Sequence, residues 1–149
     1  MFRSTGIDGF SNALDAESSK QFARKLPQEV AVEFTTADRA IDTPEGSIRA
    51  RAGDAIVTGT LGERWCVSRE RFQRKYQPVA PTTMDSAGRY ISIPTRVIAA
   101  RPIGPFEVVL ADGQSVLHGR SGDWVVDYGD GSLGVVAANV FAATYEIEP

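Results

Sequence analysis

The 149-residue chain has very little sulfur and almost no imidazole. Cys66 is its one cysteine and His118 its one histidine. A single cysteine excludes an intramolecular disulfide, and a zinc site would need mainly other ligands. No apolar run approaches the roughly 18 residues of a membrane-spanning helix, so we expect no membrane partner. Because Met1 is not followed by an apolar signal core, we expect a cytoplasmic location.

The chain also lacks an excess of positive charge. Its net charge is −3 and its pI is near 5.2, which argues against a nucleic-acid partner, because such proteins present a summed positive field. In contrast, 14 glycines and 8 prolines are present. They predict many turns, and therefore a mainly β protein of the α+β type rather than a helix bundle.

An internal repeat is the strongest pattern in the sequence. Shifting residues 51–76 by 69 positions aligns them with 120–145 and gives 8 identities, where chance gives about one or two. The shared residues are turn glycines, an acidic turn residue and periodic apolar anchors. In the first copy they are Arg51, Gly53, Asp54, Val57, Gly62, Val67, Phe72 and Tyr76.

The repeat divides the chain into four segments. Residues 1–26 form an N-terminal segment with a short helix over 13–26, and residues 1–10 are expected to be flexible. Copy one spans 27–78, a linker spans 79–93, and copy two spans 94–149. Each copy alternates like short antiparallel strands and ends in one helical turn, capped by Ser68 in copy one and by Asn139 in copy two. We therefore predict two small antiparallel barrels or bent sheets.

Each copy is too small to bury a large core alone, so we expect the two to pack as a pseudo-two-fold pair. The Gly-Asp strand, the following glycine and the Phe-x-x-x-Tyr ending resemble the PGDYG protein family. The segment from Ser121 to Gly131 resembles the family's sequence pattern most, although Ser121 stands where the family has proline. The copies also resemble small phage and prophage proteins of unassigned activity, through Arg24-Lys25-Leu26-Pro27, Val32-Glu33, Gly53-Asp54 and Gly62-Glu63. These resemblances imply shared structure and no particular reaction.

Candidate catalytic and metal-binding groups are few. Cys66 and His118 could form a nucleophile–base pair, but neither recurs in the other copy, and a strand cysteine is usually a small core residue. Asp127 to Gly131 offers hard oxygens for a cation, but an Asp/Gly hairpin tip is the ordinary explanation. We predict no catalytic residue, metal or cofactor. The turn aspartates Asp54 and Asp123 face either a ligand or the amides of their own turns.

A ligand site is predicted from arginine and aromatic side chains. Arg51 and Arg120 are the long charged residues that both copies keep, and arginine suits planar oxyanions. Trp65 and Trp124 each align with a small residue of the other copy. This exchange indicates either compensating packing of the two cores or a tryptophan that forms one wall of a pocket. The predicted contacts, in a groove between the copies, are Arg51, Arg120, Arg64, Trp65, Trp124 and Tyr128.

The sequence therefore favours an uncharacterised, non-catalytic phage-type accessory or binding protein. Its partner is expected to be an anionic small molecule or an acidic protein. Two alternatives stay open. One is a small hydrolase-like enzyme using Glu63, Asp127 or Cys66, and the other is a homo-oligomeric structural module that associates through the apolar region around Phe141.

Overall fold

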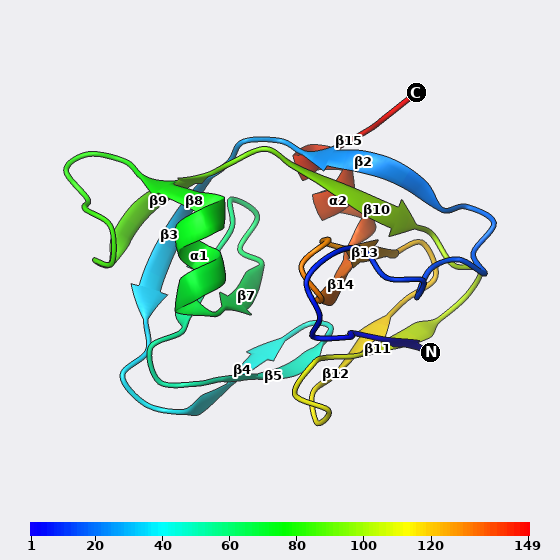
Figure 1. The fold of residues 1–149 in the computed structure, drawn as a ribbon, viewed down its shortest axis with the longest axis horizontal. Helices are drawn as coiled ribbons and strands as arrows, with labels where there is room; N and C mark the ends of the chain where they lie inside the picture. Colours follow the sequence, from blue (N-terminus) through cyan, green and yellow to red (C-terminus); the bar gives the residue numbers. More distant parts are fainter. The chain divides into compact units, whose positions relative to one another are not determined.

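The computed structural model describes all residues, 1–149, and its contacts divide them into two units (Figure 1). Unit 1 joins Met1–Lys25 to Thr95–Pro149, and unit 2 is the intervening Leu26–Pro94. The chain is mainly β, as predicted, with several antiparallel sheets and two short helices. Neither of these seven-residue helices is long and apolar enough to cross a membrane.

The strands are short. Some, such as Glu29–Phe34, alternate between buried and exposed side chains, which is the pattern that predicted them, whereas Trp124–Asp127 is buried throughout. Unit 1 contains β1 (Phe2–Arg3), β2 (Gln21–Lys25), β10 (Thr95–Ala100), β11 (Phe106–Val109), β12 (Val116–Gly119), β13 (Trp124–Asp127), β14 (Leu133–Val136), α2 (Ala138–Thr144) and β15 (Tyr145–Ile147). Unit 2 contains β3 (Glu29–Phe34), β4 (Arg39–Thr43), β5 (Gly46–Ala50), β6 (Ala55–Thr58), β7 (Arg64–Val67), α1 (Arg69–Lys75), β8 (Tyr76–Pro78) and β9 (Gly88–Ser92).

The main sheet of unit 2 has the strand order β7-β6-β3-β9-β8, with antiparallel neighbours throughout. Phe72 of α1 is fully buried, stacks on Tyr76 and meets Tyr90 edge-on at a centroid distance of 4.7 Å. The Ser68 hydroxyl accepts a hydrogen bond from the Arg71 amide and begins α1, as predicted. The helix thus closes the core with one aromatic side chain.

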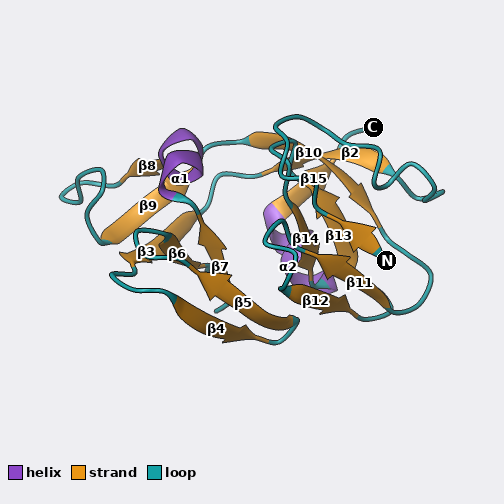
Figure 2. Cartoon of the chain, turned by 60° about the horizontal axis from the view of Figure 1, so that its bottom comes forward, coloured by secondary structure: helices purple, strands orange, loops and turns teal.

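The main sheet of unit 1 has the order β14-β13-β10-β2-β15, again antiparallel (Figure 2). Its core contains a stack of three aromatic rings, in which Phe141 of α2 lies between Trp124 and Tyr145 at centroid distances of 4.0 and 4.8 Å. Ala23, Val97 and other small residues complete the cluster. The aromatic stack supplies the large apolar surfaces of this core, since the other residues of α2 are smaller and uncharged.

The two main sheets are built in the same way. In each, a hairpin (β6-β7 or β13-β14) is followed by a short helix and an edge strand (β8 or β15). In each, the strand next to that edge pairs on its other side with a strand far away in the sequence, β2 with β10 and β9 with β3. Strand β2 inserts between β10 and β15, whereas β9 inserts between β3 and β8.

A second, smaller sheet accompanies each main sheet. In unit 2 it is the hairpin β4-β5, in which Ile41 is paired with Ile48. In unit 1 it is the hairpin β11-β12, in which Val108 is paired with Leu117, and β1 adds to its edge in parallel. The sheets therefore differ from the predicted small barrels, because no sheet closes on itself and each keeps two edge strands.

The predicted helix over 13–26 is wrong. Residues 13–16 form a turn and Gln21–Lys25 form β2, whose backbone is paired on both sides, with β10 and with β15. Two complete ladders outweigh the weak intrinsic stability of a short helix. The expectation that residues 1–10 are flexible is also wrong for Phe2 and Arg3, which pair with β11.

Two further boundaries differ from the sequence analysis. The segment 79–93, expected as a linker, contains β9, because Tyr90 fills the core of unit 2 with no exposed surface. The cap of α2 is Ala137 and not Asn139, and it makes no side-chain hydrogen bond. The helix is therefore held by Phe141 and its core contacts rather than by its cap.

The Gly-Asp turns give a prediction of stability. Gly53 and Gly122 have φ values of +93° and +96°, and a β-carbon at either position would meet no backbone atom. Replacing each glycine by alanine should therefore lower the free energy of unfolding by about 1–2 kcal/mol through backbone strain alone. Chemical denaturation of both single variants and of the double variant measures this.

The neighbouring changes Ala52→Gly and Ser121→Gly serve as controls and should have smaller effects. Because the two turns belong to different units, the two losses should add. A double variant no less stable than either single one would contradict this account.

Candidate functional site

The two Gly-Asp turns have one and the same hydrogen-bond pattern. In unit 2 the Arg51 amide donates to the Asp54 carboxylate at 2.9 Å, and in unit 1 the Arg120 amide donates to the Asp123 carboxylate at 2.9 Å. The amide of each aspartate donates back to the arginine carbonyl. Of the two alternatives for these aspartates, the structure shows the one in which each bonds the amides of its own turn.

These turns present the candidate ligand residues Arg51 and Arg120. Both follow the second strand of the small hairpin, β5 or β12, and both side chains are exposed. The backbone of each arginine is held by the turn while its guanidinium extends into solvent. This combination suits recognition, because little backbone ordering remains to be lost on binding.

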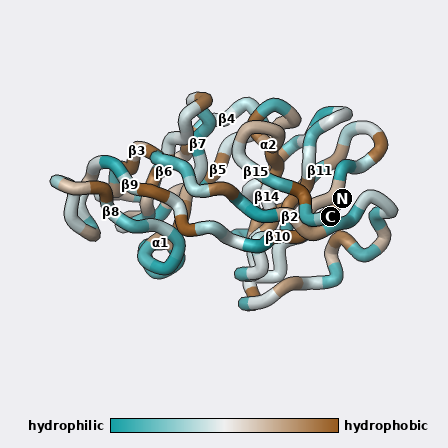
Figure 3. Tube along the Cα trace, turned by 90° about the horizontal axis from the view of Figure 1, so that it is seen from above, coloured by the Kyte–Doolittle hydropathy of each residue, from teal (hydrophilic) through white to brown (hydrophobic).

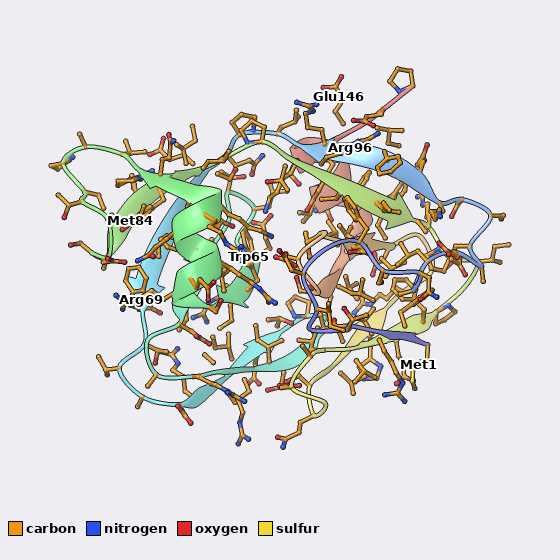
Figure 4. The ribbon with its side chains drawn as sticks, in the orientation of Figure 1. Met1, Trp65, Arg69, Met84, Arg96 and Glu146 are labelled. Atoms are coloured by element: carbon orange, nitrogen blue, oxygen red, sulfur yellow. The ribbon has the colours of Figure 1, made fainter.

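A second guanidinium lies at each turn. The Nε atom of Arg69 donates to the Gly53 carbonyl at 3.3 Å, and that of Arg101 donates to the Gly122 carbonyl at 3.1 Å. Each guanidinium also lies over an aromatic ring, Phe34 for Arg69 and Trp124 for Arg101. Arg69 begins α1, as Figure 4 shows, whereas Arg101 follows β10.

The sequence analysis selected neither Arg69 nor Arg101 for the ligand site. The two arginines do not align in the repeat: by strand register against β6 and β13, Arg101 occupies the place that Phe34 has in unit 2, and the helix of unit 1 begins with Ala138. A search for arginine near each Gly-Asp turn, rather than for aligned residues, could have found the pair.

Arg64 and Trp65 lie on β7. Arg64 is 3.7 Å from the Glu33 carboxylate, an exposed ion pair that contributes little to stability. The indole Nε1 of Trp65 donates to the Tyr76 hydroxyl at 3.2 Å (Figure 4 shows Trp65 near α1). Trp65 is half-buried, and its hydrogen bond gives the hydroxyl of the buried Tyr76 a partner.

Tyr128 performs the corresponding task in unit 1. Its hydroxyl is buried and shares a hydrogen bond with Tyr145, and burial raises the pKa of Tyr128 to about 12. A β-carbon on Gly134, the position equivalent to Trp65, would lie 2.8 Å from this hydroxyl. The tyrosine after the helix thus has an aromatic hydrogen-bond partner in both units. In unit 2 the partner of Tyr76 is Trp65 on β7, and in unit 1 the partner of Tyr145 is Tyr128, directly after β13.

Trp124 lies in the core of unit 1, with 8% of its surface exposed, stacked on Phe141. This placement accords with the packing interpretation of the reciprocal tryptophans. The structure brings Trp124, Tyr128 and Arg120 into unit 1, and Arg51, Arg64 and Trp65 into unit 2. The groove between the copies and its ligand contacts stay a prediction.

The candidate catalytic groups are engaged locally. The Cys66 thiol donates to the Asp54 carboxylate at 3.3 Å, and burial together with this carboxylate raises the pKa of Cys66 to about 12. The thiol is therefore protonated at neutral pH, which disfavours it as a nucleophile. Cys66 lies in unit 2, whereas His118 lies in unit 1, where its Nδ1 is 3.4 Å from Glu107.

The aspartates of the hairpin tip in unit 1, Asp127 and Asp130, accept hydrogen bonds from nearby residues of the same chain. The Asp127 carboxylate accepts from the amide and the hydroxyl of Ser11 and from the Gly129 amide. Asp130 accepts from the amide and the hydroxyl of Ser132. In unit 2, Glu63 accepts from the Leu61 amide. No group of three histidine, cysteine or acidic side chains is arranged to hold a metal.

The thiol environment predicts slow alkylation of Cys66. Its rate with iodoacetamide should still be rising at pH 10, without the plateau near pH 9 of an ordinary thiol. Asp54→Asn removes the nearby charge and should lower the pKa and raise the rate at a given pH. Mass spectrometry of the folded protein measures this.

Asp123→Asn is the matched control, because it weakens the equivalent turn, in the unit without the cysteine. It should leave the alkylation rate unchanged. A rate that rises equally in both variants would mean that loosening of the fold, and not the Asp54 charge, controls the thiol.

Tyr128 gives a prediction about alkaline stability. Its pKa is near 10 when unfolded and about 12 in the fold, so its contribution to stability is complete below pH 10 and is lost as pH rises toward 12. Tyr128→Phe should therefore cost stability at pH 7, through the lost hydrogen bond. At pH 11 the gap to wild type should narrow by about 1 kcal/mol. Urea denaturation at both pH values measures the gap, and a constant gap would contradict the assignment.

Comparison with known proteins gives one match. The family model described as PGDYG protein matches residues 46–146. This range includes both Gly-Asp turns, both helices and the hairpins β6-β7, β11-β12 and β13-β14. No curated protein and no solved structure matches significantly. The match extends over more than half of the chain and confirms the resemblance seen in the sequence. The chain belongs to the PGDYG protein family.

Proposed function

We propose that this PGDYG protein is a non-catalytic binding protein for an anionic group, carried by a small molecule or by an acidic protein. The observation that carries the proposal is the arginine pair at each Gly-Asp turn: Arg51 with Arg69, and Arg120 with Arg101. Guanidinium groups present a planar fork of donors that fits carboxylate and phosphate oxygens.

The engagement of the turn aspartates supports this proposal. Each carboxylate already accepts a hydrogen bond from the amide of its own turn, so that it competes less with an incoming anion for the arginine guanidinium. Arg69 and Arg101 are already bonded to a glycine carbonyl and rest on an aromatic ring. Arg51 and Arg120 are therefore the side chains proposed to engage the ligand. The second arginine adds positive potential at each turn, which in unit 2 is partly offset by the Asp85 carboxylate, 3.6 Å from Arg69.

Arg64 and Trp65 are proposed as further contacts in unit 2, because Arg64 holds only an exposed ion pair and the Trp65 ring is half-buried. In unit 1, Trp124 and Tyr128 are proposed to support the turn and hairpin from the core. The groove between the copies remains part of the proposal, as does the phage-type accessory role.

We also propose that the two copies descend from a duplicated unit. The identities between 51–76 and 120–145 support it, as do the equal strand orders of the two main sheets. The equivalent hydrogen bonds at Gly53-Asp54 and Gly122-Asp123 support it as well. On this proposal the two arginine-flanked turns are two versions of one binding element.

The test is titration of the full chain with two probes, inorganic phosphate and a glutamate-rich peptide. Saturable binding should be seen by calorimetry with at least one probe. Arg51→Ala and Arg120→Ala should each remove one site or weaken it about tenfold, since one charge-assisted contact contributes about 1.5 kcal/mol. The double variant should lose binding.

Arg24→Ala is the control, because Arg24 is an exposed arginine on β2 and belongs to neither turn. It should bind like the wild type. If neither probe binds, or if the double variant binds as tightly as the wild type, the proposal is wrong. A loss that equals that of Arg24→Ala would indicate attraction by net charge only.

A further inference from the structure

The two small hairpins differ at their outer edge. In unit 1 the strand β11 pairs on one side with β12 and on the other with β1, which forms the edge of the sheet. In unit 2 the strand β4 pairs with β5 alone, and Figure 2 draws it as the outermost strand of that unit. One hairpin therefore has a third strand, whereas its counterpart keeps an open edge.

The pairing of β1 shows how this kind of hairpin takes an added strand. Phe2 lies opposite Val108 and Arg3 opposite Val109, in parallel, and the Ser4 amide donates to the Val109 carbonyl at 2.9 Å. The Phe2 ring meets the edge of Phe106 at 5.9 Å on the buried face. The Arg3 side chain lies on the exposed face.

The edge of β4 repeats this geometry. Ile41 lies opposite a buried aliphatic residue, as Val108 does in β11, and is itself 2% exposed. By position along the hairpin, Asp42 corresponds to Val109, whose carbonyl accepts the added strand. A two-residue turn closes β4-β5, and alternation along such a hairpin directs the peptide groups of Ala40 and Asp42 away from β5.

The side chains at this edge define what would fit. Ala40 is small and exposed, so that a strand can approach β4 closely. Asp42 is exposed and places a carboxylate where β11 has the buried, apolar Val109. A residue that pairs with Asp42 would thus gain from a positive charge, and one that pairs with Ile41 would gain from an apolar side chain.

Charged residues on an edge strand often serve only to prevent unwanted pairing. At β4 that explanation applies to Arg39, whose guanidinium is 4.0 Å from Glu33 and projects from the other end of the strand. A single carboxylate near the turn end of the edge, two residues from the small Ala40, repels acidic strands and attracts basic ones. The edge is therefore selective rather than closed.

We propose that β4 is a docking edge for an extended segment of a partner protein, which adds in parallel with an apolar residue beside Ile41 followed by a lysine or arginine beside Asp42. Main-chain hydrogen bonds to Ala40 and Asp42 would supply the affinity, and the two side chains the selectivity. This surface is separate from the Gly-Asp turn proposed above to bind anions, and it selects the opposite charge.

The probe is an acetylated, amidated peptide with the sequence of residues 1–6, Met-Phe-Arg-Ser-Thr-Gly, which carries the required apolar–basic pair. Titration into the ¹⁵N-labelled full chain should give saturable shifts of the amides in β4 and β5. A peptide with glutamate in place of arginine should bind at least fivefold more weakly.

Two variants of the protein locate the contact. Ala40→Pro removes a peptide N–H from the free edge without removing a bond to β5, and should abolish the shifts. Asp42→Lys leaves the backbone unchanged and should reverse the preference, so that the glutamate peptide binds better. The dispersion of the remaining amide signals reports whether each variant is folded.

Three results would overturn the proposal. One is the absence of saturable shifts in β4 at millimolar peptide, and another is equal affinity for the arginine and glutamate peptides. The third is a set of shifts confined to β11 and β12, because the peptide would then only be exchanging with the chain's own β1.

Discussion

Completion of each main sheet by a strand from a distant part of the sequence is the constraint on which the rest depends. β2 and β9 carry the fully buried Ala23 and Tyr90, and each pairs on both sides. Without β9, the strands β3 and β8 would lose their shared neighbour, and Phe72 of α1 would lose one of its aromatic contacts. The helices and the Gly-Asp turns depend on these sheets. Folding must therefore establish pairings of large sequence separation before local elements become stable.

The Gly-Asp turn shows how one small motif separates structural from recognition tasks. Glycine accepts the positive φ, and the aspartate binds the amide of the preceding arginine, so the backbone is held without any contribution from the guanidinium. The side chains of Arg51 and Arg120 are therefore not needed to hold the turn in either unit. The second arginine comes from α1 in unit 2 and from the end of β10 in unit 1. A requirement for positive charge at this place, met from two different elements, explains why the aligned positions Arg69 and Ala138 differ.

Local and periodic features could be predicted from the sequence, and distant pairings could not. The strand over Glu29–Phe34, the Ser68 cap and the family resemblance follow from alternation, turn chemistry and motif spacing. The strand β2 was predicted as a helix because its apolar spacing is ambiguous over so few residues, and only its two partners decide the matter. The Cys66–Asp54 contact also joins residues on different elements. Of the candidate site, the exposed arginines follow from sequence, whereas Arg101 does not, since no aligned residue marks it.

The two units have similar backbones, but their helices leave different surfaces. α1 has the sequence Arg-Glu-Arg-Phe-Gln-Arg-Lys and is drawn largely hydrophilic in Figure 3, whereas α2 carries no charged residue. Both helices keep one buried phenylalanine and a tyrosine after it, so the core requirement is the same. Apart from Thr144, which is buried, and Val140, which packs against the core, the remaining helix positions are less constrained by packing and can be used for different partners. The hairpins follow the same rule, because β11 is covered by the chain's own β1 whereas β4 keeps its edge and a carboxylate. Equal cores with unequal surfaces let each unit present its own helix and hairpin surface in addition to the Gly-Asp turn that both units keep.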